Sequence, residues 1–201
     1  MLVLASASPR RQELLRHAGI EFVVHPADIP EDPLPGEMPR DCAERLAREK
    51  ARKVFQQRPN DLILGADTVV FVDGQMLAKP LDQADATRML RLLSGRTHQV
   101  ITGVCLIGSH VRSEKAAPGS GFEDTRSETT NVTFSALTED DIRFYVASGE
   151  PMDKAGAYAI QGIASRWIPH MEGDYSNVVG LPAALVCRML QEHGVTSRGP
   201  S

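Results

Sequence analysis

Hydrophobic and polar positions along the chain form short blocks that predict strands and helices in turn. Apolar runs predict strands over residues 2–5, 20–24, 62–64, 69–72, 98–107, 129–137 and 166–170. Apolar residues at helical spacing predict helices that begin after Ser8, at Arg40, after Asp82, after Thr138 and at Pro182. Because strands and helices alternate through most of the chain, the predicted fold class is α/β.

Segments rich in proline, glycine and polar residues separate these elements. Residues 25–39 are rich in proline and acidic side chains and are predicted to form a loop. Residues 109–125 indicate an exposed hairpin loop, and residues 150–162, rich in glycine and alanine, indicate a structured loop. No internal repeat and no clear linker is present, so residues 1–201 are predicted to form one domain.

The composition is that of an ordinary globular protein, with 42% hydrophobic residues and a net charge of −4. That charge argues against a general nucleic-acid binder, because such proteins carry a basic face. The three cysteines are widely separated and show no spacing typical of a disulfide framework or a zinc site. No signal peptide and no apolar run of membrane-spanning length is present. We therefore expect a cytoplasmic protein without a membrane partner.

The start of the first predicted helix carries an unusual charge. Ser8 is placed as its N-cap and Pro9 as its first residue, and Gly19 ends the helix. The first turn of a helix favours acidic side chains, yet Arg10 and Arg11 stand there, each at a cost of about a few tenths of a kcal/mol. An anion would relieve that cost, so the pattern indicates a phosphate site. The alternative is a pair of solvated surface arginines.

Asp67 lies between two apolar runs, followed by a predicted turn at Asp73-Gly74. An ionised carboxylate in apolar surroundings is costly unless it is paired or binds a metal. Gly65 and Ala66 would leave room beside it for a ligand. The alternative is a turn aspartate that accepts hydrogen bonds from nearby backbone N–H groups.

Two further charged residues are candidates for the same chemistry. Lys50 falls on the inward stripe of the helix over residues 40–57, where a snorkelling side chain is the simpler interpretation of this residue by itself. Glu31 is a second carboxylate on the acidic loop, and it is equally compatible with a solvated loop residue. Two carboxylates together with Arg and Lys side chains suit metal-assisted phosphoryl chemistry.

Three polar residues in the second half of the chain complete the candidates. Lys79 follows the predicted hairpin, and Lys154 lies in the loop rich in glycine and alanine; both could meet phosphate or face solvent. Gln161 has a side chain that both donates and accepts hydrogen bonds, as recognition of a base edge requires.

Seven stretches of the chain form a joint pattern. They are LASASPRRQELL at 4–15, RLAREKA at 45–51, GADTVV at 65–70, KPLD at 79–82, LSGRTHQVITGV at 93–104, GEPMDKAGAYAIQG at 149–162 and NVVGLP at 177–182. This pattern spans nearly the whole chain and resembles the Maf family of nucleoside triphosphate pyrophosphatases. The resemblance implies a mixed twisted sheet with flanking helices and two lobes around a cleft, similar to the inosine-triphosphatase architecture. It also implies an enzyme that releases pyrophosphate from a nucleoside triphosphate and requires a divalent metal, Mg²⁺ or Mn²⁺.

The resemblance also implies roles for individual residues. Asp67 falls on the family's proton acceptor and, with Glu31, on its metal site. The positions that line the phosphate site are those of Ser8, Arg11, Lys50 and Lys79. Asp28 and Asp32 lie close to Glu31 and are alternatives for its position.

Three positions distinguish the branches of the family. Arg10, Thr68 and Gln161 match the branch that prefers dTTP and UTP, rather than the sister branch that acts on 7-methyl-GTP. A homodimer is a further expectation from the family. The main alternative function is a non-catalytic, nucleotide-sensing regulator of cell division, because the family has also been described as septum-formation proteins. The sequence argues against a dinucleotide oxidoreductase, because no Gly-x-Gly-x-x-Gly follows a strand, and it excludes a P-loop ATPase or kinase, because no Gly-Lys-Ser/Thr is present.

Overall fold

The computed structural model describes residues 1–109 and 121–195 of the chain. The elements in chain order are β1 (Leu2–Leu4), α1 (Pro9–His17), β2 (Val23–Val24), α2 (Pro39–Gln57), β3 (Leu62–Val72), β4 (Gln75–Leu77), α3 (Gln83–Leu93), β5 (Thr97–Ser109), β6 (Gly121–Thr133), α4 (Glu139–Ala147), η1 (Glu150–Asp153), η2 (Ala155–Ala157), η3 (Ile163–Trp167), β7 (His170–Glu172), α5 (Tyr175–Val179) and α6 (Ala183–Glu192). The η elements are short 3₁₀ helices.

The chain divides into two compact units. Unit 1 consists of Met1–Asp67, Thr102–Glu128 and Gly180–Ser201. Unit 2 consists of Thr68–Ile101 and Thr129–Val179. A single domain over residues 1–201, with a cleft between two lobes, stays a prediction.

The strands form a mixed sheet in the order β2-β1-β3-β5-β6-β7, and β4 pairs with β3. Strand β1 runs parallel to both β2 and β3, with Val3 opposite Val23 and Ile63. Strand β4 runs antiparallel to β3, and β7 runs antiparallel to β6. The predicted α/β class with a mixed sheet and flanking helices is confirmed.

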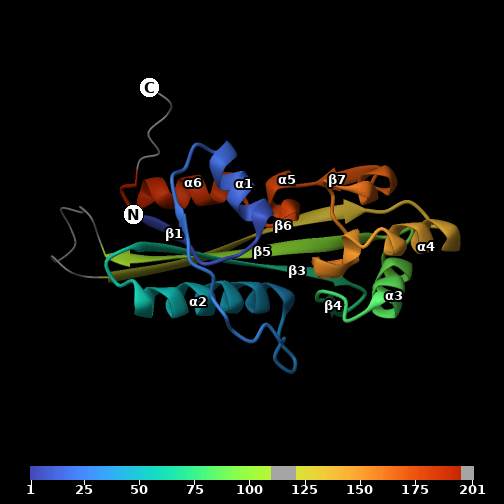
Figure 1. Ribbon diagram of the computed structural model, residues 1–201, viewed down its shortest axis with the longest axis horizontal. Coiled ribbons are helices and arrows are strands. Elements are labelled where there is room, and N and C mark those ends of the chain that lie inside the picture. Colours follow the sequence, from blue (N-terminus) through green and yellow to red (C-terminus); the bar gives the residue numbers. More distant parts are fainter. Residues whose placement is uncertain (110–120, 196–201) are drawn as a thin grey trace. The chain divides into compact units, whose positions relative to one another are not determined.

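In unit 1 the sheet is covered on both faces, by α2 on one and by α1 and α6 on the other (Figure 1). Side chains alternate along β1 because successive residues of a strand point to opposite faces. Leu2 and Leu4 pack with Leu15 of α1, in a core that α6 completes. Val3 packs in the separate core against Ala47 of α2. Ile63 of β3 is paired with Val3 and lies in the same core, so every second residue of β3 counted from Ile63 faces α2.

Two glycines allow the backbone of α2 to lie directly on the sheet. A Cβ atom at Gly65 of β3 would lie 2.2 Å from the carbonyl oxygen of Ala47, and one at Gly103 of β5 would lie 2.3 Å from that of Ala43. No side chain fits at these distances. The space beside Gly65 is therefore filled by helix backbone, and the expectation that this glycine leaves room for a ligand is wrong.

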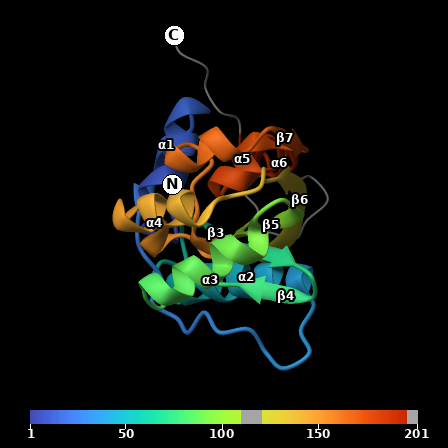
Figure 2. The same ribbon diagram turned by 90° about the vertical axis from the view of Figure 1, so that its right-hand side faces the viewer.

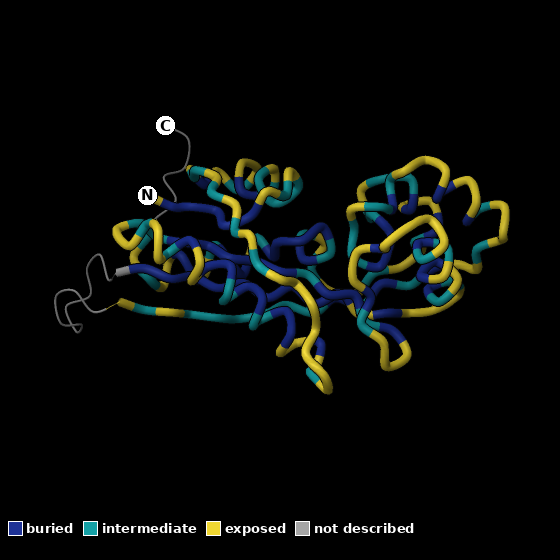
Figure 3. The backbone as a smooth tube through the Cα atoms, turned by 60° about the horizontal axis from the view of Figure 1, so that its bottom comes forward, coloured by how far each residue is buried: buried dark blue, intermediate teal, exposed yellow. Residues whose placement is uncertain are grey.

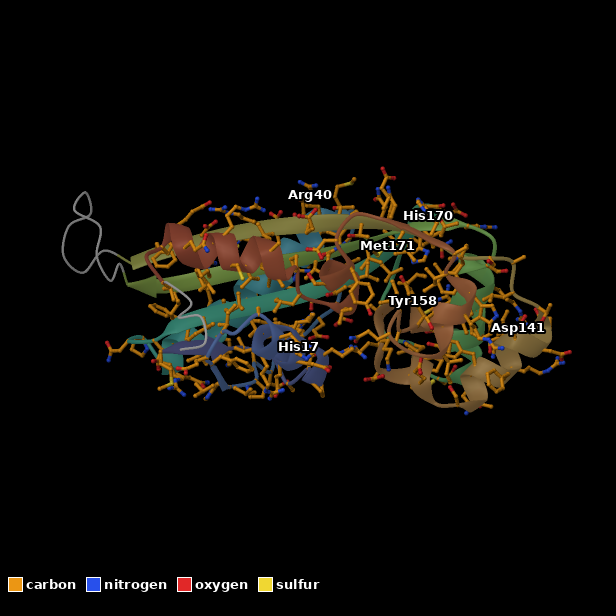
Figure 4. The ribbon with its side chains drawn as sticks, turned by 90° about the horizontal axis from the view of Figure 1, so that it is seen from above. His17, Arg40, Asp141, Tyr158, His170 and Met171 are labelled. Atoms are coloured by element: carbon orange, nitrogen blue, oxygen red, sulfur yellow. The ribbon has the colours of Figure 1, made fainter. Side chains whose placement is uncertain are left out.

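Unit 2 has its own core, in which α3 and α4 pack together with the 3₁₀ segments (Figure 2). Thr138 caps α4 at the predicted helix start, and its hydroxyl and the Asp141 carboxylate form a capping box (Asp141 is labelled in Figure 4). His98 and Tyr158 are buried in this core, with 2.7 Å between His98 Nε2 and the Tyr158 hydroxyl.

Several predicted boundaries are wrong. The two apolar runs around Asp67 form one continuous strand, β3, which pairs with β1 at its start and with β4 at its end. Strand β6 already begins at Gly121, so the end of the predicted hairpin loop at residues 109–125 is strand; residues 110–120 lie outside the described part of the chain.

Two short strands also differ from the expectation. Residues 166–170 were predicted as a strand, but η3 occupies Ile163–Trp167 and strand β7 begins only at His170 (labelled in Figure 4). Only Val23–Val24 pair within the predicted strand at residues 20–24. Such short segments have no strong intrinsic preference, and their neighbours in the fold decide their conformation.

The predicted loop between β2 and α2 is confirmed. Residues 25–38 contain no helix or strand, and residues 30–36 are all exposed (Figure 3). Helix α2 begins at Pro39, the last residue that was expected in the loop, because proline suits the first position of a helix. Within the described residues, no helix has the length and apolar character that a membrane span requires. The three cysteines are free thiols.

Candidate active site

The candidate site begins where β1 leads into α1. Ser8 is the N-cap of α1, and its hydroxyl accepts a hydrogen bond from the Arg11 backbone N–H at 3.5 Å. Pro9 occupies the first helical position, and the first turn contains no acidic residue. The predicted helix start is confirmed, with Arg10 and Arg11 in the turn where the helix dipole is positive.

The Arg11 guanidinium folds back across this helix start. Its Nε donates to the Gly180 carbonyl oxygen at 2.8 Å, and its Nη1 donates to the Ser6 hydroxyl at 3.1 Å. Burial lowers the pKa of Arg11, while the negative charges of Asp67 and Glu31 act in the opposite direction. Arg11 is therefore held by backbone and serine within the field of two carboxylates.

Lys50 of α2 lies between these two carboxylates. Its Nζ is 2.6 Å from Oδ1 of Asp67 and 2.5 Å from Oε1 of Glu31. The side chains of Lys50 and Asp67 are only 6% and 11% exposed, whereas that of Glu31 is 42% exposed. The ammonium does not reach out to water, so the snorkelling interpretation of Lys50 is wrong.

The position of Asp67 follows from the register of the sheet. Ile63 of β3 belongs to the core beneath α2, and Gly65 lies against the α2 backbone. Asp67 is two residues further along the same strand and therefore lies on the same face. The interpretation of Asp67 as a turn aspartate is wrong. It is a strand residue whose charge is balanced by Lys50.

The two carboxylates fit a divalent cation by their chemistry. Their oxygens already lie within 2.6 Å of one positive atom, Lys50 Nζ. Mg²⁺ is commonly held by one or two carboxylates together with substrate phosphates and water. No cluster of three or more His, Cys, Asp or Glu side chains suited to a metal occurs in the described ranges 1–109 and 121–195. Glu31 and Asp67 supply two carboxylate groups of the type that Mg²⁺ binds.

Within the acidic loop, the ion pair with Lys50 distinguishes Glu31 from its neighbours. Asp32 contributes its backbone carbonyl to Arg45 instead, at 3.1 Å. Asp28 is an exposed residue three positions earlier. The geometry favours Glu31 over the two alternatives for the second carboxylate.

A family model, described as Maf-like protein, matches residues 1–193. The chain belongs to this family. A dTTP/UTP pyrophosphatase from Koribacter versatilis is 54% identical over 194 residues, which are 96% of this chain and 95% of that protein. A dTTP/UTP pyrophosphatase from Symbiobacterium thermophilum is 49% identical and covers 96% of this chain and 94% of its own length. These names agree with the enzyme class predicted from the sequence.

Among solved structures, a HAM1 protein from Coxiella burnetii is similar with a TM-score of 0.48 and 19% sequence identity. The similarity covers 95% of this chain and 98% of that one. The recognition of the Maf family from the sequence is confirmed by the family model and the relatives.

The remaining predicted site residues of this Maf-family chain lie in several places. Arg10 is partly buried, and its charge acts on Arg11 in unit 1. Thr68, also partly buried, directly follows Asp67 in β3. Lys79, between β4 and α3, and Gln161, in a turn before η3, are exposed residues of unit 2. That these two residues join the cluster of unit 1 stays a prediction.

Sequence reasoning missed the residues that hold the candidate site together. Ser6 and Gly180 fix Arg11, and Gly180 has a φ of 126°, which favours glycine. Both residues lie in stretches that carry the family resemblance. The sequence could therefore indicate that they matter, but not that they contact Arg11. Arg45 and Glu37, which tie the acidic loop to α2, were also missed.

Proposed function

We propose that this Maf-family chain hydrolyses dTTP and UTP to the nucleoside monophosphate and pyrophosphate. Relatives about half identical over 96% of the chain carry the name dTTP/UTP pyrophosphatase. The observation that carries the chemistry is the buried carboxylate of Asp67, 2.6 Å from the Lys50 ammonium and in the electrostatic field of Arg11. A carboxylate and cations gathered in one place suit phosphoryl transfer, in which positioned charge supplies most of the catalysis.

Asp67 is the proposed proton acceptor. A water oxygen attacks one phosphorus of the α–β bridge, and its proton passes to the Asp67 carboxylate. The bond from that phosphorus to the bridging oxygen breaks, and the bridging oxygen leaves with the bonding electron pair on the other phosphate. Lys50 donates a hydrogen bond of 2.6 Å to one oxygen of Asp67 and thereby fixes the orientation of the carboxylate.

The cations of the chain bind the triphosphate in this proposal. Arg11 is held by Ser6 and Gly180 in the first turn of α1, where the backbone N–H groups also attract anions. Ser8, Lys50 and Lys79 are the other proposed phosphate contacts. Together they balance the negative charge that moves onto the leaving phosphate.

A divalent metal, Mg²⁺ or Mn²⁺, would be held by Glu31 and Asp67, and when bound it would neutralise charge on the phosphate oxygens. Arg10, Thr68 and Gln161 are proposed to select the pyrimidine base. A Gln161→Glu variant with the same preference for dTTP over 7-methyl-GTP as the parent would contradict the role of Gln161. A cytoplasmic homodimer that needs no nucleic acid or membrane remains a prediction.

The direct test is pyrophosphate release from dTTP and UTP with Mg²⁺ or Mn²⁺, by the full chain and by Asp67→Asn. The variant keeps the shape of the side chain and removes its charge, so kcat should fall by orders of magnitude while far-ultraviolet circular dichroism stays unchanged. Near-normal turnover by Asp67→Asn would contradict its role. If the unaltered chain binds these nucleotides without releasing pyrophosphate, the result would favour the alternative function, a nucleotide-sensing regulator. The relatives' names do not support that alternative.

A further inference from the structure

Glu31 is carried by a segment that has no regular structure to hold it. Residues 25–38 form neither helix nor strand, and the Glu31 side chain is 42% exposed. A carboxylate on such a segment loses conformational freedom whenever it binds a cation, at a cost of about 1–2 kcal/mol for each residue that becomes fixed. The chain therefore needs something else to fix this loop if Glu31 is to bind well.

Arg45 of α2 makes the contacts that fix it. Its Nε donates to Oε1 of Glu37 at 2.6 Å, and its Nη2 donates to Oε2 of Glu37 at 2.8 Å. The same Nη2 donates to the carbonyl oxygen of Asp32, the residue after Glu31, at 3.1 Å. One guanidinium thus grips the loop at two points, in the bidentate geometry that arginine forms with carboxylates.

Glu37 in turn closes the loop between these two points. Its carboxylate accepts a hydrogen bond from the Leu34 backbone N–H at 3.0 Å, and its own N–H donates to the Leu34 carbonyl at 3.1 Å. Gly36, with a φ of 75°, takes the left-handed conformation that this turn requires. The side chains of Arg45 and Glu37 are 19% and 9% exposed, so water has limited access to the ion pair.

The charge on this pair is secure. Hydrogen bonds from Arg45 lower the pKa of Glu37 to about 2, so the carboxylate is ionised throughout the working range of an enzyme. Arg45 also donates to Glu49 one helical turn further along α2, at 3.3 Å, which holds the guanidinium in place. The ion pair between Arg45 and Glu37 is therefore part of the folded structure whether or not a ligand is bound.

We propose that Arg45 is a positioning residue for Glu31: through Glu37 and the Asp32 carbonyl it holds the acidic loop so that Glu31 faces Lys50 and Asp67 before any ligand binds. This inference rests on the proposed function for the role of Glu31. Second-sphere partners of metal-binding groups typically contribute 10–100-fold in affinity. We expect loss of the Arg45 grip to weaken the apparent affinity for Mn²⁺ about tenfold.

The variants are Arg45→Met, which removes the grip, and Glu37→Gln, which breaks the same ion pair from the loop. The matched control is Arg52→Met. Arg52 lies on the same helix and forms an equally bidentate pair with Glu123, at 2.6 and 2.8 Å, on strand β6 and not on the acidic loop. Arg45→Lys keeps the positive charge but lacks the bidentate guanidinium. Its apparent affinity for Mn²⁺ should therefore lie between those of Arg45→Met and the parent.

The first measurement is hydrogen–deuterium exchange of peptides from residues 28–38, in the full chain without metal or nucleotide. Exchange should be faster in Arg45→Met and Glu37→Gln than in the parent, and unchanged in Arg52→Met. Exchange as slow as in the parent would overturn the proposal, as would equal acceleration in the control. This measurement needs no turnover, so it decides whether Arg45 fixes the loop even if the proposed function fails.

The second measurement is pyrophosphate release from dTTP as a function of Mn²⁺ concentration. The Mn²⁺ concentration for half-maximal rate should rise about tenfold in Arg45→Met, with kcat at saturating Mn²⁺ close to that of the parent. In a Glu31→Gln background the same Arg45 change should have little further effect, because both act on one contact. A lower kcat with an unchanged Mn²⁺ dependence would overturn the proposal. Absence of turnover in the parent would instead refute the proposed function.

Discussion

The close contact between α2 and β3 can be tested with the substitution Gly65→Ala, which adds a single methyl group. Gly65→Ala adds a Cβ that would lie 2.2 Å from the Ala47 carbonyl oxygen and 2.8 Å from the Ala51 backbone nitrogen. Both atoms are helix backbone, so no side-chain rotation relieves the clash. Ordinary contact begins at 3.4 Å, so the helix must retreat from the strand by about 1.2 Å.

That displacement has two measurable consequences. Overpacking in a well-packed core typically costs about 1–3 kcal/mol, and a clash with backbone belongs at the upper end. For a chain of this length, about 3 kcal/mol lowers Tm by about 6–12 °C. Lys50 lies on the same helix one turn beyond Ala47, so its ammonium moves away from Asp67. A misplacement of about 1 Å at a reacting group can cost about 100-fold in rate.

The assay compares the parent, Gly65→Ala and Gly121→Ala by urea denaturation and by kcat for dTTP. Gly121, in β6, is the matched control, because a Cβ there would meet its nearest atom at 3.6 Å. Gly65→Ala should lose stability and turnover together, and Gly121→Ala should lose little of either. Stability within about 0.5 kcal/mol of the parent, with normal kcat, would mean that α2 does not lie on β3 as described.

Three further outcomes are expected. Lys50→Met leaves the Asp67 carboxylate buried without its cation, so the free energy of unfolding at pH 7, measured in urea, should fall by about 3–5 kcal/mol. Burial lowers the pKa of His98 to about 4; since the unfolded imidazole binds its proton near pH 6.5, stability should fall as the pH drops from 6.5 to 4, by about 3 kcal/mol in total. In His98→Gln, the free energy of unfolding measured in urea at each pH should depend less on pH. An unchanged dependence on pH would show that His98 is not its cause. Thr138→Ala removes the capping box of α4 and should lower stability by about 1 kcal/mol. Thr87→Ala, at a half-buried position inside α3 where the hydroxyl caps no helix end, should lower it by less.

Helix starts were predictable because their determinants are local. Ser8, Asp82 and Thr138 each accept a hydrogen bond from a backbone N–H three residues later, so a short window of sequence contains the whole interaction. Strand ends were not predictable in this way. Strand β3 continues through Gly65 and Asp67 because its neighbours in the sheet complete the ladder, and no local preference indicates those partners.

The pair of Lys50 and Asp67 shows why the site was only half visible in the sequence. Helical periodicity correctly put Lys50 on the inward stripe, and the apolar runs correctly put Asp67 in apolar surroundings. Taken singly, each residue had a simple structural explanation: Lys50 could be a snorkelling lysine and Asp67 a turn aspartate. Both explanations fail because each charge is the partner of the other, 17 residues apart. A buried cation and a buried anion predicted on adjacent elements are better interpreted together than singly.

The acidic loop marks the limit of that reasoning. Its prolines and acids correctly predicted the absence of regular structure, and from that composition Glu31 could equally have been a solvated residue. What distinguishes Glu31 is a three-dimensional arrangement: Arg45 grips the loop on either side of a turn and leaves Glu31 facing Lys50. The sequence contains no trace of this arrangement beyond an arginine on a helix and a glutamate eight residues earlier. Loop residues acquire a fixed position through the side chains that anchor the loop, and those anchors are found only once the helix and the loop are seen together.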